Sequence, residues 1–115
     1  VTPPRLAIVS SSKNARPVLE AAGLLDRFEL VVDGLVGAEL ELPGKPAPDT
    51  YLHAATWLGV PAEKAVVVED ALSGVASGRN GKFGLVVGVD RGAGDQELLD
   101  AGADTVVADL ADFVG

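Results

Sequence analysis

The segment that most limits how this chain can fold is Val66-Val67-Val68-Glu69-Asp70, in which three β-branched residues are followed by two acids. A run of valines without polar alternation is typical of a strand in a parallel sheet that is covered on both faces. Ligands of open α/β sheets bind outside the carboxyl ends of the strands. The run therefore predicts a central parallel strand, buried on both faces, with Glu69 and Asp70 at the edge that carries a site.

The other apolar runs alternate with helical patterns, which indicates a parallel sheet with crossover helices. The predicted order is strand 6–9, helix 15–22, strand 28–32, helix 49–58, strand 66–69, helix 71–79, strand 84–89, helix 95–101, strand 105–107 and a terminal turn at 110–114. The stretch 33–48 contains several glycines and prolines and is predicted to be largely irregular. Repeats, low-complexity tracts and linkers are absent from the sequence, so residues 1–115 are expected to be part of a single domain.

Composition narrows the classes of partner and location. The chain carries 9 Lys and Arg residues against 17 Asp and Glu, a formal net charge of −8, which disfavours nucleic acid and anionic membranes as partners. It contains no Cys, which excludes disulfides and thiolate metal sites. No apolar run approaches the roughly 20 residues of a spanning helix, so we expect a cytoplasmic protein. Because the chain has no Met and opens on Val1, we expect a fragment or a processed product.

Polar residues gather where three predicted strands end. Residues 10–14 follow the first strand, Glu69 and Asp70 end the third, and Asp90 follows the fourth. Because the carboxyl ends of parallel strands lie along one edge, these residues are expected to face one crevice. A serine-rich turn at a helix start can hold a phosphate or carboxylate, and Lys45 adds a cation from the long loop. Together with carboxylate oxygens, this set favours a divalent metal beside a bound phosphate.

Each of these signals also has a purely structural interpretation. Residues 10–14 fit an ordinary helix N-cap, and Lys45 fits a solvated loop side chain. The pair Glu69-Asp70 fits a cap of the helix that follows it. His53 is interpreted as a surface or structural residue rather than a general base, and Trp57 as a packing residue.

Three segments, taken together, resemble the motifs of one family. They are Val9-Ser10-Ser11-Ser12-Lys13-Asn14, Gly44-Lys45-Pro46-Ala47-Pro48-Asp49 and Val68-Glu69-Asp70-Ala71-Leu72-Ser73-Gly74-Val75. In order and spacing they look like the second, third and fourth motifs of the haloacid dehalogenase superfamily. The similarity is closest to its β-phosphoglucomutase-like branch of phosphatases and sugar-phosphate mutases. The resemblance implies a Rossmann-like three-layer α/β/α core with a mostly parallel sheet.

The resemblance also implies how a phosphoryl group would be bound. Ser10 would donate a hydrogen bond to the transferring group, helped by the backbone N–H of Ser11 and its neighbours. Lys13 and Asn14 would lie near the phosphate or the rest of the substrate. Lys45 would neutralise the charge of the phosphoryl oxygens and of the nucleophile.

The acidic motif would supply the metal site. Asp70 would bind Mg²⁺, with Glu69 as a second ligand, direct or through water. The implied activity is that of a Mg²⁺-dependent phosphatase or phosphomutase. Its expected substrate is a small phosphorylated metabolite, with a sugar phosphate as the first candidate.

One part of the family pattern has no counterpart in the chain. Nothing matches the first motif, Asp-x-Asp-Gly-Thr, whose strand lies between those ending at Ser10 and Asp70 and carries the nucleophilic aspartate. The helical cap domain that follows it is also absent. Because no phosphoaspartyl intermediate can form without the nucleophile, we expect the chain alone to be inactive. We further expect two half-sheets with unpaired edges, completed by an N-terminal segment of the same protein or by a separate chain, unless the halves rearrange.

Two other interpretations stay open. The missing nucleophile favours a nonenzymatic fragment or an anion-binding module with the same fold, and an Asp-x-Asp segment elsewhere in the molecule would count against it. A flavodoxin-like or response-regulator-like domain shares the fold but leaves Gly44-Lys45-Pro46 unexplained.

Overall fold

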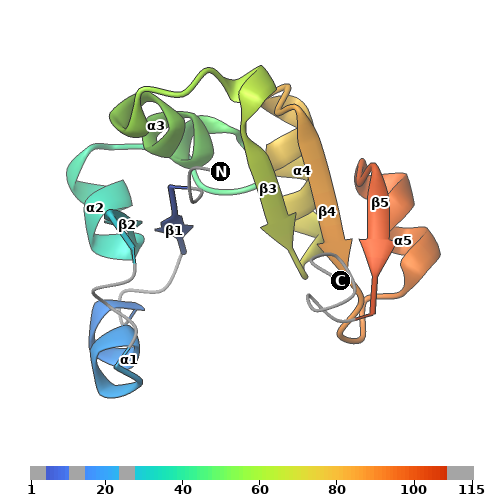
Figure 1. The fold of residues 1–115 in the computed structure, drawn as a ribbon, viewed down its shortest axis with the longest axis horizontal. Helices are drawn as coiled ribbons and strands as arrows, with labels where there is room; N and C mark the ends of the chain where they lie inside the picture. The colour runs from blue at the N-terminus through green and yellow to red at the C-terminus, as the bar shows by residue number, and fades with distance from the viewer. Residues whose placement is uncertain (1–4, 11–14, 24–27, 109–115) are drawn as a thin grey trace.

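The computed structural model describes residues 5–10, 15–23 and 28–108, in which strands and helices alternate (Figure 1). In chain order the elements are β1 (Ala7–Val9), α1 (Ala15–Ala21), β2 (Leu30–Val32), α2 (Gly34–Glu39), α3 (Asp49–Leu58), β3 (Val66–Glu69), α4 (Leu72–Asn80), β4 (Leu85–Val89), α5 (Asp95–Ala101) and β5 (Thr105–Val107). A short 3-10 turn at Ala62–Lys64 leads into β3. The predicted order of strands and helices is therefore confirmed, with α2 as an additional helix.

The strands form two sheets rather than one. β1 pairs with β2, and β4 lies between β3 and β5 in a second sheet. All these pairings are parallel. Figure 1 shows β1 and β3 as the facing strands of the two sheets, with α3 beside the space between them. The two half-sheets expected from the sequence are present in the described part of the chain.

The larger sheet carries the main core. α4 and α5 contact each other and the same sheet, and the buried cluster consists of Val67, Val75, Val86, Leu98 and Ala103. Gly78 lets α4 approach the sheet, because a Cβ at this position would lie only 3.0 Å from Val86 Cγ2 and 3.2 Å from Val67 Cγ1. The small residue therefore sets how closely α4 packs on β3 and β4.

β3 is buried on one face only, which differs from the sequence-based prediction. Val67, beneath α4, is 3% exposed, whereas Val66 and Val68 are 52% and 41% exposed. The predicted burial on both faces is wrong for this chain, because Val66 and Val68 line an open cavity. An apolar edge with unpaired backbone groups is a ready template for another strand.

The stretch 33–48, predicted to be largely irregular, contains the helix α2. Asp33 is buried and its Oδ1 accepts a hydrogen bond from Val36 N at 2.9 Å, which caps the first turn. The Nε of Arg16 lies 3.7 Å from the other oxygen of Asp33. The aspartate cap thus stabilises a helical turn in spite of the two glycines within it.

Elsewhere the predicted boundaries agree with the structure to within about two residues, and the predicted turn at 110–114 lies outside the described residues. The packing role predicted for Trp57 is wrong, because its side chain is 54% exposed. α3 instead turns Tyr51, Ala54, Ala55 and Leu58 toward the space between the sheets. Within the described residues, the helices are all too short or too polar to cross a membrane.

Candidate functional site

A cavity of about 1170 Å³ lies between the two sheets. Residues of β1 and β3 form its facing walls, and α3 lines it between them. Much of the wall is apolar, but the residues that end the two strands add Ser10, Glu69 and Asp70. Lys45 joins them from the loop before α3. The structure therefore brings together four of the residues selected from the sequence.

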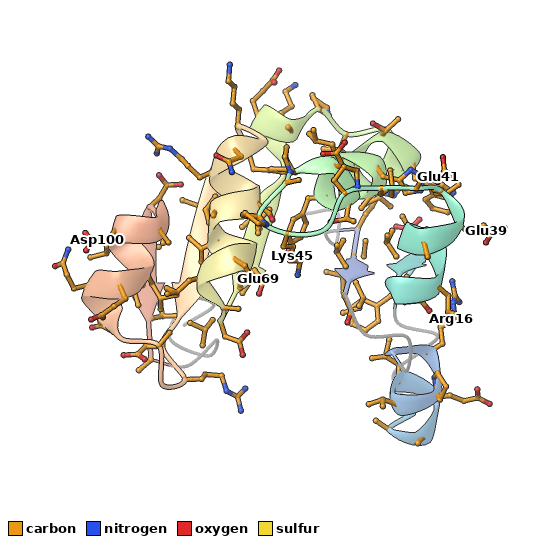
Figure 2. The ribbon with its side chains drawn as sticks, turned by 180° about the vertical axis from the view of Figure 1, so that it is seen from behind. Arg16, Glu39, Glu41, Lys45, Glu69 and Asp100 are labelled. Carbon is orange, nitrogen blue, oxygen red and sulfur yellow. The ribbon has the colours of Figure 1, made fainter. Side chains whose placement is uncertain are left out.

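The central contact of this site is the ion pair between Lys45 and Glu69. Lys45 Nζ donates to Glu69 Oε2 at 2.6 Å, and it lies 3.4 Å from Val9 O as a second acceptor. The two side chains are only 14% and 10% exposed, so solvent screens this pair less than a surface pair. Figure 2 shows both side chains extending toward each other from different segments. The ammonium therefore connects the end of β3 with the end of β1.

The loop that carries Lys45 is anchored to α4. Asn80 Nδ2 donates to Pro46 O at 3.1 Å, and Ala47 N donates to Gly44 O at 3.0 Å. The peptide bond between Lys45 and Pro46 is cis. Lys45 is thus held on an anchored turn with most of its side chain buried, and the solvated-loop interpretation is wrong.

Tyr51 completes the cluster, although it was not among the predicted site residues. Its hydroxyl donates to Glu69 Oε2 at 2.6 Å, and Lys45 Nζ lies 5.1 Å from the centre of its ring. The ring makes an edge-to-face contact with Phe83, with 6.0 Å between centroids. The signal in the sequence was a hydroxyl on an otherwise apolar helix face, because a buried tyrosine hydroxyl needs a partner. We call these side chains the Lys45–Glu69–Tyr51 cluster.

Gly74 makes room for the Glu69 carboxylate. A Cβ at position 74 would overlap that carboxylate, which therefore lies against the first turn of α4. The N-cap residue of α4 is Ala71, which makes no side-chain cap. Glu69 accepts hydrogen bonds from Lys45 and Tyr51, which are contacts of the cluster rather than of a helix cap.

The other predicted site residues are distributed as follows. Asp70 is exposed and Ser10 half-buried, and both line the cavity. Ser10 N donates to Val32 O at 2.8 Å, which extends the pairing of β1 with β2. Ser11, Lys13 and Asn14 lie outside the described residues.

Asp90 does not join the cavity, contrary to the expectation that it faces the same crevice. Its Oδ1 accepts hydrogen bonds from Gly92 N and Gly94 N, both at 3.1 Å, and so closes the loop before α5. The Gly92 N–H, a hydrogen bond with the Asp95 carboxyl and the Gly94 N–H hold the pKa of Asp90 below its usual range. The same contact with Asp90 raises the pKa of Asp95. Asp90 is therefore a loop-closing residue.

Asp70 and Glu69 are the carboxylates available to a divalent cation at the cavity. Mg²⁺ is usually held by one or two carboxylates together with phosphate oxygens and water, so this donor set fits it. Among the described residues, no three His, Asp or Glu side chains come together around a possible metal position. Any further protein oxygen would have to come from outside this set.

The buried phenol of Tyr51 leads to a prediction for alkaline pH. Burial, the charge of Glu69, the hydrogen bond to Glu69 and the charge of Asp70 raise the pKa of Tyr51. The folded chain therefore holds the phenolic proton more tightly than the unfolded chain, which loses it at about pH 10. The resulting stabilisation is complete below that pH and is lost as the pH rises above it. Because Tyr51 is the only tyrosine, tyrosinate absorbance of this chain reports on it alone. Ionisation near pH 10 with the fold intact by circular dichroism would contradict the prediction.

The space above Gly74 leads to a second prediction. Gly74→Ala should displace the Glu69 carboxylate, because the new methyl group occupies its position. Tyr51 would then lose a hydrogen bond and a nearby charge, so its ionisation in the folded chain should begin at lower pH than in the wild type. Gly37→Ala is the matched control, since nothing lies within 4 Å of a Cβ at that helical glycine. An unchanged tyrosinate curve in Gly74→Ala would show that Glu69 keeps its position.

Comparison with known proteins agrees with this geometry. The sequence model of the haloacid dehalogenase-like hydrolase family matches residues 4–82 of this chain. A β-phosphoglucomutase from Mycobacterium bovis is 51% identical over 113 residues, which are 95% of this chain and 43% of that protein. A haloacid dehalogenase family hydrolase from Deinococcus radiodurans, solved with bound phosphate and sodium, is 32% identical and superposes with a TM-score of 0.79. The match covers 93% of this chain and 48% of that protein's chain. The β-phosphoglucomutase of Clostridium difficile gives 29% identity and a TM-score of 0.78 over 94% and 44%.

The extent of these matches decides what they establish. The chain spans less than half the length of each of these relatives, so their activities are not transferred to it by similarity alone. The family model, however, covers more than half of the chain, and the order of motifs and the parallel sheets agree with it. The chain belongs to the haloacid dehalogenase-like hydrolase family.

Proposed function

We propose that this chain forms the carboxyl-terminal part of the core of a Mg²⁺-dependent phosphatase or phosphomutase. The observation that carries the proposal is the position of Lys45 Nζ, which is held between Glu69 at the end of β3 and Val9 O at the end of β1. A largely buried ammonium at the polar part of a cavity is suited to a phosphoryl group. The family of the chain makes phosphoryl transfer the reaction to test first.

Electrostatic stabilisation is the main contribution of these residues. An ammonium has three N–H donors, and within the described residues Glu69 and Val9 O accept two of them, which leaves one for a phosphoryl oxygen. Ser10, which lines the same cavity, is the proposed hydrogen-bond donor to that group. Ser11, Lys13 and Asn14 follow Ser10 in the sequence and are proposed to lie near the phosphate or the substrate. Such preorganised charges are most of what a protein supplies to phosphoryl transfer.

The two acids at the end of β3 are the proposed ligands of Mg²⁺. Asp70 is exposed at the cavity and presents a carboxylate to it, while Glu69 is adjacent in the chain. When bound, Mg²⁺ neutralises negative charge on the phosphoryl oxygens. Glu69 also binds Lys45, so as a ligand of Mg²⁺ this carboxylate would contact both cationic groups.

The proposed substrate is a small phosphorylated metabolite, with a sugar phosphate as the first candidate. Relatives described as β-phosphoglucomutases support this class, as does the phosphate bound in the Deinococcus radiodurans protein. The absence of Cys and the net charge of −8 are compatible with a cytoplasmic location, which is part of the proposal. Hydrolysis and mutase chemistry use the same phosphoryl site and are separated by the assay below.

An assay of the complete protein tests this proposal. A panel of sugar phosphates is incubated with and without Mg²⁺, and phosphate release and sugar-phosphate isomers are both measured. Lys45→Ala and Asp70→Asn should each lower the rate by roughly 10²-fold or more, as loss of one preorganised group does. Asp100→Asn is the control, because Asp100 is exposed on α5, far from the labelled Lys45 and Glu69 in Figure 2. No Mg²⁺-dependent turnover, or full activity in both variants, would contradict the proposal.

We also propose that an extended strand lies between β1 and β3 in the complete protein. The edges on which β1 and β3 face each other (Figure 1) have no strand partner in the described chain. Unpaired backbone groups are costly when they are buried. Val66 and Val68 expose apolar surface to the cavity, and the small side chains of Ala54 and Ala55 line it from α3. The proposed strand belongs to the segment that precedes this chain in the same protein, or to a separate chain that replaces it.

Complementation tests this second proposal. The chain alone should be inactive and should gain Mg²⁺-dependent phosphatase or mutase activity when the preceding segment is added as a separate polypeptide. Val68→Lys should weaken that association by at least about tenfold, because burial of an unpaired charge is costly. Leu99→Lys is the matched control, because Leu99 is 42% exposed on α5 and Val68 is 41% exposed on β3. Activity of the chain alone, or equal binding by both variants in calorimetry, would argue against strand insertion.

A further inference from the structure

One oxygen of Glu69 accepts two strong hydrogen bonds. Lys45 Nζ and Tyr51 OH each lie 2.6 Å from Oε2, a usual distance for a hydroxyl that donates to a carboxylate and a short one for an ammonium. The three side chains come from the loop before α3, from α3 itself and from the end of β3. We therefore expect a substitution at Tyr51 to alter the hydrogen bond that Lys45 donates to the same oxygen.

The ring of Tyr51 contacts the same ammonium from a second direction. Lys45 Nζ lies 5.1 Å from the ring centre, within the range of a cation–π interaction. Phe83 supports the ring edge-to-face at an interplanar angle of 71°. Lys45 Nζ is thus placed by a carboxylate, a backbone carbonyl and an aromatic ring.

Glu69 Oε2 has two lone pairs, so it accepts the hydrogen bonds of the ammonium and of the hydroxyl at the same time. The hydroxyl also fixes the direction of the carboxylate, which fixes where Lys45 ends.

We propose that Tyr51 is a positioning residue that holds the Lys45 ammonium and the Glu69 carboxylate in place for a phosphoryl group. Its hydroxyl acts through Glu69, and its ring acts on Lys45 directly. The inference rests on the proposed function, since it names the residue that positions the cation of that site. It also adds to that function, because Tyr51 lies in none of the three motif segments from which the other site residues were selected.

A double-mutant cycle in the complete protein tests this inference. Tyr51→Phe keeps the ring and removes the hydroxyl, and it should weaken binding of inorganic phosphate, measured by calorimetry, by roughly tenfold. In a Lys45→Met background the same change should have almost no further effect, because Tyr51 acts through Lys45. Tyr51→Leu, which removes the ring as well, should weaken phosphate binding more than Tyr51→Phe. Trp57→Phe, at the exposed aromatic residue of the same helix, should leave phosphate affinity unchanged.

A spectroscopic readout separates positioning from general stability. The ¹⁵N resonance of the Lys45 ammonium, identified by its loss in Lys45→Met, should shift in Tyr51→Phe while the thermal melting curve changes little. If Lys45→Met fails to fold, Lys45→Gln takes its place in the cycle. An unshifted resonance, or an equal loss of phosphate affinity with and without Lys45, would overturn the inference.

The outcome for the proposed function is decided separately. Wild-type turnover of sugar phosphates together with wild-type behaviour of Tyr51→Phe in both measurements would overturn only the role of Tyr51. Coupling of Tyr51 to Lys45 in phosphate binding, without turnover of any sugar phosphate, would support the positioning role and count against the enzymatic one.

Discussion

The hydrogen-bonded ion pair between Lys45 and Glu69 is the interaction on which the site depends. It joins a loop anchored by α4 to the end of β3, and Lys45 Nζ reaches Val9 O at the end of β1. Because both side chains are largely buried, removing either partner would leave a charge with little solvent around it. The pair is therefore both a structural link between the sheets and a set of two largely buried charges at the cavity.

The second constraint is the requirement that strand edges be paired. β1 and β3 each have one strand partner in the described chain, and the cavity between them is lined by apolar residues of both. Val66 and Val68 are exposed and line this cavity. The strand proposed above would pair the free edges of β1 and β3 and would fill the cavity that these valines line.

Much of the fold was predictable because it depends on local periodicity, and each failure has its own physical cause. The order of strands and helices follows from apolar runs and their breaks, whereas the exposure of Val66 and Val68 depends on how the two sheets are arranged, which local periodicity does not specify. The site was found at Ser10, Lys45, Glu69 and Asp70 because parallel strands end at one edge. Tyr51 was not predicted because its proposed role depends on a contact with Glu69 that the fold creates between distant segments. Asp90 was misplaced because its side chain bonds to its own loop.

The two sides of the cavity differ in how their site residues are held. Lys45, Glu69 and Tyr51 are fixed by one another and by α3, α4 and β3, so this side of the site is organised within the described chain. Ser10 follows β1 in the other sheet, and the contact of 3.4 Å between Lys45 Nζ and Val9 O joins that strand to the cluster. A strand paired with both β1 and β3 would fix the spacing of the two edges by its backbone hydrogen bonds. Such a strand would therefore set the distance between the Ser10 and Lys45 sides of the site, in addition to any catalytic group that it carries.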